Sequence, residues 1–219
     1  MKRLRRWIAW AAAAFAGVVV LYRWVPPPVT PLMLLRARES GITKTWVPLD
    51  AVSPTLVRAV IAAEDGRFFT HGGVDWVAAR DAREYNARHG GAPRRGASTI
   101  TMQCARNVFL WPGKTWIRKT VEVVLAYAIE AVWGKRRILE VYLNVIEWGP
   151  GVYGAEAAAR ASFGVAAADL DPPRAALLAA VLPNPRRWAA SHPTSYVLGR
   201  AGVILRRAAG VRLDALDVR

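Results

Sequence analysis

Two adjacent carboxylates, Glu64 and Asp65, lie where helix stability does not explain them. Ser53 and Pro54 predict a helix start, as N-cap and first helical residue, and apolar residues at helical spacing carry that helix to about Glu64. Carboxylates at a helix C-terminus face the negative end of the helix dipole, which costs about 0.3–1 kcal/mol each. A turn at Asp65-Gly66 beside a solvated Glu64 is the structural alternative to a chemical role.

Aromatic residues and glycines follow this pair directly, in Phe68-Phe69 and in His71-Gly72-Gly73. The pKa of a carboxyl group rises beside aromatic side chains, which is the environment that proton transfer near neutral pH requires. Glycines let the backbone approach such a site closely. The sequence therefore predicts Glu64 as a proton-transferring group, while His71 either orients Glu64 or closes a turn.

Charge and aromatic content narrow the class of partner. The chain of 219 residues has a net charge of +15, and the segment up to Val25 holds five bases and no acid, so the remainder still carries +10. Such a surplus indicates a polyanionic partner, which is nucleic acid, anionic lipid or pyrophosphate. Several of the ten tryptophans lie beside arginines, as a lipid headgroup boundary favours, and no nucleic-acid-binding motif occurs, so we expect no nucleic acid. The lone Cys104 excludes an intrachain disulfide.

The N-terminus predicts a membrane anchor. Basic residues within Lys2–Arg6 precede an apolar stretch from Trp7 to Val25, and these nineteen residues, at about 1.5 Å each, span roughly 28 Å if Arg23 snorkels. The basic flank predicts a cytoplasmic N-terminus, with the rest of the chain outside the inner membrane. A cleaved signal peptide is the alternative, because Ala14-Phe15-Ala16 resembles a cleavage site. We divide the chain into a tail and anchor (1–25), a linker (26–45) and one domain (46–219).

The remaining pattern predicts a mainly α-helical domain without a central alternating strand. Trp76 is expected on the apolar side of the helix that follows the carboxylate motif, and Ser98 is expected to cap the next helix. The longest helix, with an apolar stripe through Val121 and Val124, is expected to end at Gly134. The predicted helices cover residues 32–38, 53–64, 74–87, 98–106, 115–133, 135–144, 155–163, 171–182 and 194–209.

Three stretches allow two interpretations each. Arg88–Gly96, rich in glycine and arginine, is either a solvated connector or a flap over an anionic substrate. Asn107–Trp116 is a membrane-dipping loop if exposed and ordinary core if buried. Arg118 and Glu122 are four apart on one helix face, and by pattern alone they form a surface pair that contributes less than about 0.5 kcal/mol.

With these residues in view, the sequence resembles the peptidoglycan glycosyltransferases, specifically the monofunctional biosynthetic transglycosylases of bacteria. Four motifs carry the resemblance in order: EDGRFFTHGGVD from Glu64, GASTITMQ from Gly96, RKTVE from Arg118 and KRRILEVYLNVIEWGPGVYG from Lys135. No Ser-x-x-Lys occurs, so the peptide cross-linking of bifunctional relatives is not expected.

Two positions depart from the pattern of the family. Met102 occupies a position where many members have Gln, and a thioether cannot make the hydrogen bonds of an amide, which calls a polar role of this position into question. Arg106 replaces a common Lys, which keeps the charge and alters its geometry.

The resemblance implies a lysozyme-like α-helical fold with a small membrane-associated lobe, and polymerisation of lipid II on the outer face of the cytoplasmic membrane. Glu64 would take the proton of the acceptor 4-hydroxyl as this attacks the anomeric carbon of the donor chain. A β-1,4 bond forms with inversion and undecaprenyl pyrophosphate leaves. Glu122 would be the second catalytic glutamate, orienting cations or pyrophosphate.

The resemblance also implies a set of substrate-binding residues. Cations around the leaving pyrophosphate would act where its charge develops. These are Arg106, Lys114, Arg118 and Lys119, while Ser98, Thr99 and Gln103 would bind donor sugar or phosphate, and Asp65 and Asn144 would organise the site.

Cofactor, partners and alternatives follow from the same comparison. No cofactor is expected to be required and no metal-ligand set is present in the sequence, although Mg²⁺ or Mn²⁺ can accompany the substrate pyrophosphate. Expected partners are lipid II, nascent glycan strands, membrane lipid, and proteins of cell division or elongation. One alternative is a lytic transglycosylase or muramidase-like hydrolase, which needs neither pyrophosphate-binding cations nor a lipid-facing loop. The other is a non-catalytic scaffold of cell-wall synthesis, which only Met102 favours.

Overall fold

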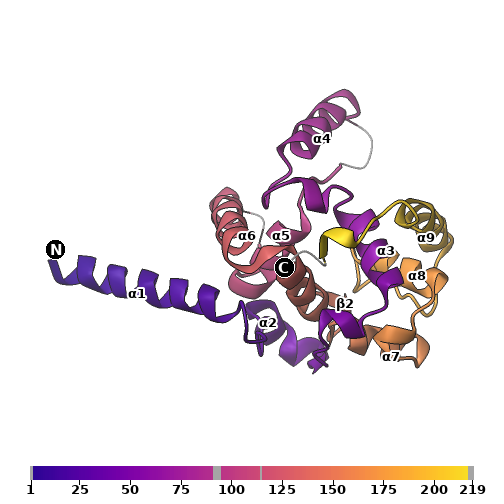
Figure 1. The fold of residues 1–219 in the computed structure, drawn as a ribbon, viewed down its shortest axis with the longest axis horizontal. Coiled ribbons are helices and arrows are strands. Elements are labelled where there is room, and N and C mark those ends of the chain that lie inside the picture. Colours follow the sequence, from indigo (N-terminus) through magenta and orange to yellow (C-terminus); the bar gives the residue numbers. More distant parts are fainter. Residues whose placement is uncertain (1, 91–94, 114, 217–219) are drawn as a thin grey trace.

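The computed structural model describes residues 2–90, 95–113 and 115–216 and confirms a mainly α-helical domain behind one apolar N-terminal helix (Figure 1). The helices of the domain are α2 (Pro31–Ser40), α3 (Pro54–Glu64), α4 (Trp76–Arg88), α5 (Ile100–Phe109), α6 (Trp116–Val145), α7 (Ala155–Phe163), α8 (Pro172–Val181) and α9 (Ser195–Ala208). Short 3-10 turns cover Leu49–Ala51, Phe68–Thr70, Ala167–Asp169 and Asp214–Leu216.

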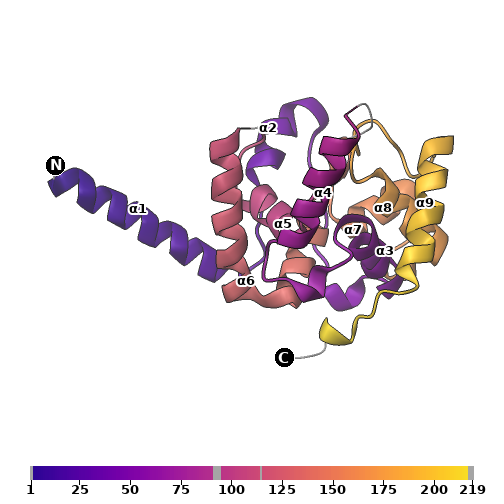
Figure 2. The same cartoon turned by 90° about the horizontal axis from the view of Figure 1, so that it is seen from above.

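The domain helices form two groups around one hydrophobic core. α5 lies along α6, whereas α3 packs against α8 and α9. Buried side chains from both groups belong to a single cluster, among them Ile61, Ile100, Leu139 and Leu178. Figure 2 shows α6 toward one side of the molecule and α9 at the opposite side. α3 is buried along most of its length, so the carboxylate at its end is placed by the core itself.

A small sheet, which the sequence did not predict, joins the N-terminal part of the domain to its middle. Its strands are β1 (Thr43–Lys44), β2 (Glu147–Gly149) and β3 (Val152–Tyr153), in the order β1-β3-β2. β3 pairs parallel with β1 and antiparallel with β2. Within the predicted linker 26–45, the structure places α2 and β1, and Met33 of α2 is fully buried.

The long helix α6 combines two predicted helices. Thr115 caps its start, and Gly134 interrupts it with φ 73° and ψ 165°, a backbone conformation that glycine adopts without strain. The apolar stripe is partly wrong, because Val121 and Val124 are 37% and 61% exposed. The buried face of this helix instead includes Glu122, which the pattern had placed on the solvent-exposed face.

Two other local predictions need correction. The N-cap of α5 is Thr99 rather than Ser98, since the Thr99 hydroxyl accepts a hydrogen bond from the Met102 N–H at 3.1 Å. Trp76 at the start of α4 is 61% exposed rather than buried on an apolar face. Its indole N–H donates to the Tyr127 hydroxyl at 2.8 Å on the surface of α6.

The helix α1 (Lys2–Leu21) is the one candidate membrane span among the described residues, with a mean hydropathy of 1.5. It projects away from the domain, as Figure 1 shows, and only its last turns make contact. The Trp133 indole N–H donates to the Val19 carbonyl at 2.7 Å, and the rings of Phe15 and Tyr22 pack on Phe109. The end of α1 therefore packs against α6 and the end of α5.

Two of the three stretches that the sequence left open, 107–116 and Arg88–Gly96, are described in part by the structure. In the stretch 107–116, Leu110 is buried, whereas Trp111 and Trp116 are 51% and 77% exposed, so one part belongs to the core and another is exposed. That the exposed part dips into the membrane stays a prediction. Residues 91–94 of the stretch Arg88–Gly96 lie outside the described residues, so its role as connector or flap stays a prediction. At its far end the backbone of Arg95 exchanges two hydrogen bonds with the Asn86 side chain, which ties this end to α4.

Candidate active site

Glu64 ends α3 and is held between two other helices. Its Oε2 accepts a hydrogen bond from Gln103 Nε2 of α5 at 2.9 Å, and its Oε1 lies 3.7 Å from Nη2 of Arg200 of α9. The side chain is only 14% exposed, which removes the solvated alternative. Glu64 also lines a hollow of about 660 Å³, together with Phe69 and the segment that follows α9. A shielded carboxylate that borders an open space can exchange a proton with a bound molecule.

Gln103 links Glu64 to the second half of α6. Its Oε1 accepts from the Tyr142 hydroxyl at 3.2 Å, so its amide nitrogen must face Glu64. Burial, followed by the nearby charge of Glu64, raises the pKa of Tyr142 well above its usual value. Tyr142 is therefore neutral at physiological pH, and its hydroxyl donates to the amide oxygen in the orientation that the Glu64 carboxylate requires.

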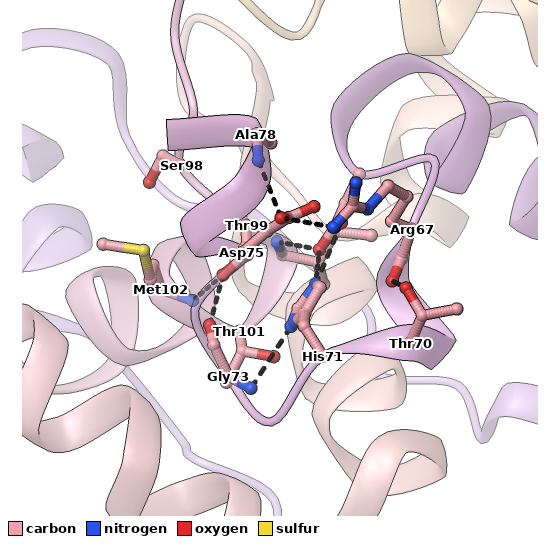
Figure 3. A network of polar contacts seen from close by, with 12 residues as sticks. Arg67, Thr70, His71, Gly73, Asp75, Ala78, Ser98, Thr99, Thr101 and Met102 are labelled. Carbon is pink, nitrogen blue, oxygen red and sulfur yellow. Dashed lines mark hydrogen bonds and ion pairs between the residues drawn. The ribbon is translucent and has the colours of Figure 1, made fainter. Parts of the chain in front are cut away.

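His71 orients Asp65 rather than Glu64. The His71 Nε2 lies 3.1 Å from both carboxylate oxygens of Asp65, and its Nδ1 accepts from the Gly73 N–H at 3.2 Å. These partners assign the proton to Nε2. Asp65 Oδ2 also accepts from the Ile100 N–H at 2.9 Å, at the start of α5. Figure 3 shows His71 bridging toward Gly73 within this network, so both predicted roles of His71 were incomplete.

Glu122 is fully buried at the centre of an ion cluster, which corrects the prediction of a surface pair. Its Oε2 binds Nη1 of Arg118, and its Oε1 binds Nζ of Lys119 at 2.6 Å and accepts from Ser98 Oγ at 3.4 Å. Arg118 is also buried, whereas Lys119 is 44% exposed. Glu122 thus holds two cations side by side in the first turns of α6.

Arginines line a cavity of about 330 Å³ next to this cluster. Its walls combine Arg106 and Arg118 with Arg36 of α2, which pairs with Glu147 in the same wall, and Gln103 and Tyr142 also face it. The Gln103 side chain therefore lies between Glu64 and the cavity that the arginines line. Lys114, the other predicted cation, lies outside the described residues.

Two residues predicted near the substrate, Thr99 and Asn144, and the departing position Met102 contact the backbone or the core. The Thr99 hydroxyl caps α5 and donates its hydrogen to the Gly73 carbonyl at 2.6 Å. The hydroxyl hydrogen is therefore used within the protein, which differs from the predicted contact with substrate. Asn144 is fully buried, with its amide paired to both backbone groups of Val47. Met102 packs in a small apolar cluster with Val74 and Ala126, which accounts for a thioether at this position.

Sequence reasoning missed Arg200, Tyr142 and Arg36. Each lies far along the chain from Glu64 or from the cationic motif, and reaches the site only through helix packing. Tyr142 lies inside the fourth motif, which was a usable signal, whereas nothing in the pattern of α2 or α9 pointed to the site. Among the described residues, no group of three or more His, Cys, Asp or Glu side chains could hold a metal ion.

A shielded carboxylate beside a cavity lined by guanidinium groups suits the transfer of a group from an anionic leaving group to an acceptor hydroxyl. The class of protein is thus a group-transfer enzyme with one candidate membrane span. Comparison with known proteins specifies it further. The family model described as Transglycosylase matches residues 33–209, and the chain belongs to this family.

Curated relatives agree over nearly the whole chain. A biosynthetic peptidoglycan transglycosylase of Rhodospirillum centenum is 55% identical over 218 residues, covering 99% of this chain and 94% of the relative. Proteins of the same name from Bdellovibrio bacteriovorus and Caulobacter vibrioides are each 50% identical, covering 98% and 90% of this chain and 89% and 86% of those proteins.

Proposed function

We propose that this protein polymerises the glycan strands of peptidoglycan, transferring the growing undecaprenyl-pyrophosphoryl chain to the 4-hydroxyl of lipid II. The chain is a peptidoglycan glycosyltransferase by family, and its relatives are named as biosynthetic peptidoglycan transglycosylases. The observation that carries the proposal is the position of Glu64. Its carboxylate accepts a hydrogen bond from the Gln103 amide, and Gln103 lines a cavity together with three arginines.

The donor is expected to place its pyrophosphate in the cationic cavity. Arg106 and Arg118 line this cavity, and Lys119 is joined to Arg118 through Glu122. Preorganised cations stabilise the charge that develops on the departing pyrophosphate, which lowers the barrier without reorganisation. Where Mg²⁺ or Mn²⁺ takes part, it would arrive with the pyrophosphate and would neutralise part of its charge.

The acceptor is expected to reach Glu64 from the hollow of about 660 Å³ that Glu64 borders. As the 4-hydroxyl oxygen attacks the anomeric carbon, its proton passes to the Glu64 carboxylate and the bond to the pyrophosphate oxygen breaks. Attack on the face opposite the leaving group gives a β-1,4 bond with inversion. Glu64 then returns its proton to solvent.

The cationic cavity also separates this proposal from a lytic enzyme. Cleavage of a finished glycan releases no pyrophosphate and gains nothing from arginines in this position. Glu122 and Arg118 are buried and paired with each other, so these two charges are maintained at the cost of their desolvation, while Lys119 pairs with Glu122 and stays 44% exposed. Such a cluster favours an anionic substrate, which lipid II is.

We further propose that α1 is a retained single-pass anchor of the inner membrane, with its N-terminus in the cytoplasm. The packing of Phe15 on Phe109 supports retention, because cleavage after Ala16 would remove Phe15 and leave Phe109 less covered. Partners among cell-division or elongation proteins remain part of this proposal.

The test is polymerisation of labelled lipid II by the full-length protein in detergent, with wild type beside Glu64→Gln. Wild type should yield a lysozyme-sensitive ladder on a gel, and Glu64→Gln should reduce the rate by at least about 10²-fold, the effect typical of removing a general base. Labelled lipid II should still bind to Glu64→Gln, since the cationic cavity is intact.

The matched control is Glu84→Gln, which removes an exposed carboxylate paired with Arg80 and Arg88 on α4. It should polymerise like wild type. Full turnover by Glu64→Gln would overturn the role of Glu64, and cleavage of preformed glycan without any polymer would favour the lytic enzyme.

A further inference from the structure

The bend in α6 at Gly134 brings two charged side chains together. Glu130 and Lys135 are five positions apart, so they would not face each other on a straight helix. In the bent helix, Lys135 Nζ lies 2.8 Å from Glu130 Oε1, and the two side chains are only 18% and 15% exposed. The second oxygen of Glu130 accepts from the Thr101 hydroxyl of α5 at 2.9 Å. The pair thus joins both halves of α6 to α5.

Lys135 also binds the loop that follows the catalytic carboxylate. Its Nζ donates to the His71 carbonyl at 2.7 Å and lies 4.5 Å from the centroid of the Phe68 ring. An ammonium group has three donors and is attracted to the face of an aromatic ring. One side chain therefore contacts the loop at two residues while it stays paired with Glu130.

The other half of α6 contacts the same loop at Gly73. Gly73 has a φ of +98°, and a Cβ there would come within 3.0 Å of the Ala126 carbonyl oxygen. The Thr99 hydroxyl donates to the Gly73 carbonyl, and Figure 3 shows Thr99, Gly73 and His71 around this turn. The loop is therefore held from both sides of the bend, and the His71 side chain projects from it to Asp65.

We propose that Lys135, paired with Glu130, is a positioning residue for the transfer reaction. By holding the His71 backbone, it sets the imidazole N–H against Asp65, which directly follows Glu64 at the end of α3. Lys135 lines neither of the two cavities described above, so it acts through the loop and not on substrate. This inference rests on the proposed polymerase function.

The test compares lipid II polymerisation by wild type, Lys135→Met and Lys135→Arg. Methionine keeps the length of the side chain and loses its charge and donors, and we expect kcat to fall about 10- to 100-fold, the scale of a displacement of about 1 Å in a reacting group. KM for lipid II should stay within about twofold, because the substrate cavities are unchanged.

The variants Lys135→Arg and Glu130→Gln separate an effect on positioning from an effect on stability. Lys135→Arg keeps the charge beside Glu130 but moves the donors, so its thermal midpoint should match wild type while kcat still falls. Glu130→Gln keeps one acceptor oxygen for Lys135, while its amide N–H can donate to the Thr101 hydroxyl oxygen, so this variant should retain activity to within about threefold. Arg136→Met is the matched control, because Arg136 is the next residue and pairs only with exposed Asp50 in the described contacts.

The outcomes are distinguishable from failure of the proposed function. If wild type makes no polymer, the polymerase proposal itself fails. If wild type polymerises and Lys135→Met matches it, or if activity follows the thermal midpoint across all four variants, Lys135 is a structural residue only and the inference is overturned.

Discussion

Gln103 is the residue on which the geometry of the site depends most directly. Its amide has one acceptor end and one donor end, and the Glu64 carboxylate accepts, whereas a phenol hydroxyl such as that of Tyr142 can donate or accept. Reversing the amide would set the oxygens of Gln103 and Glu64 against each other. The orientation is thus determined by the Glu64 carboxylate, and the buried Tyr142 hydroxyl completes it by donating to the amide oxygen.

This leads to a prediction at alkaline pH. Because the pKa of Tyr142 is raised in the folded protein, the folded state keeps its proton when the unfolded chain loses it near pH 10.0. The stabilising contribution of Tyr142 is therefore complete below pH 10 and decreases as pH rises above it. Urea unfolding of wild type and Tyr142→Phe between pH 8 and pH 11 should show a steeper loss of unfolding free energy for wild type above pH 10. Parallel curves for the two proteins would contradict this assignment.

At the scale of the element, α6 supplies the cations, the phenol and the loop contacts from one helix. Arg118 and Glu122 belong to its first turns, whereas Lys135 and Tyr142 follow the bend at Gly134. A straight helix would direct its second half elsewhere. The bend is therefore a condition for joining the cationic cluster to the Gln103 hydrogen bonds in one site.

Gly134→Ala tests the bend. A Cβ at Gly134 meets no atom within 4 Å, so its cost comes from the φ of +73° alone and is expected to be about 1–2 kcal/mol in unfolding free energy. Gly164 is the matched control, since it ends α7 at a φ of +68° with equally open space. Both alanine variants should lose similar stability in urea, and only Gly134→Ala should also slow lipid II polymerisation. Equal rates for both variants would show that the bend is dispensable for the reaction.

At the scale of the whole molecule, large apolar side chains are exposed at the start of α6 and in the stretch before it. α1 packs on Phe109 and on Trp133 near the bend of α6, whereas Trp111, Trp116 and Ile117 are exposed before and at the other end of this half of α6. Large exposed apolar residues around a basic surface suit a lipid headgroup boundary. We therefore expect this side of the domain to lie against the membrane, with α9 directed away from it (Figure 2).

Flotation with anionic liposomes tests this orientation. A chain lacking residues 1–25 should still float in part, and replacing Trp111 and Trp116 by Ser should reduce the bound fraction, because apolar rings leave the interface. Tyr196→Ser removes a comparably exposed aromatic residue, 60% exposed on α9, and should leave binding unchanged. A larger loss for Tyr196→Ser than for the tryptophan pair would reverse the proposed orientation.

The sequence by itself determined the helices with strong caps and breaks, the position of Glu64 at a helix end, and the family, because these depend on neighbouring residues and on motifs. It could not place Arg200 or Arg36 at the site, since both reach it by packing of distant helices. It also assigned Arg118 and Glu122 to the surface, because charged residues at helical spacing usually face water. Only the tertiary structure shows that this face of α6 is covered, and that covering turns an ordinary ion pair into a buried cluster beside the cationic cavity.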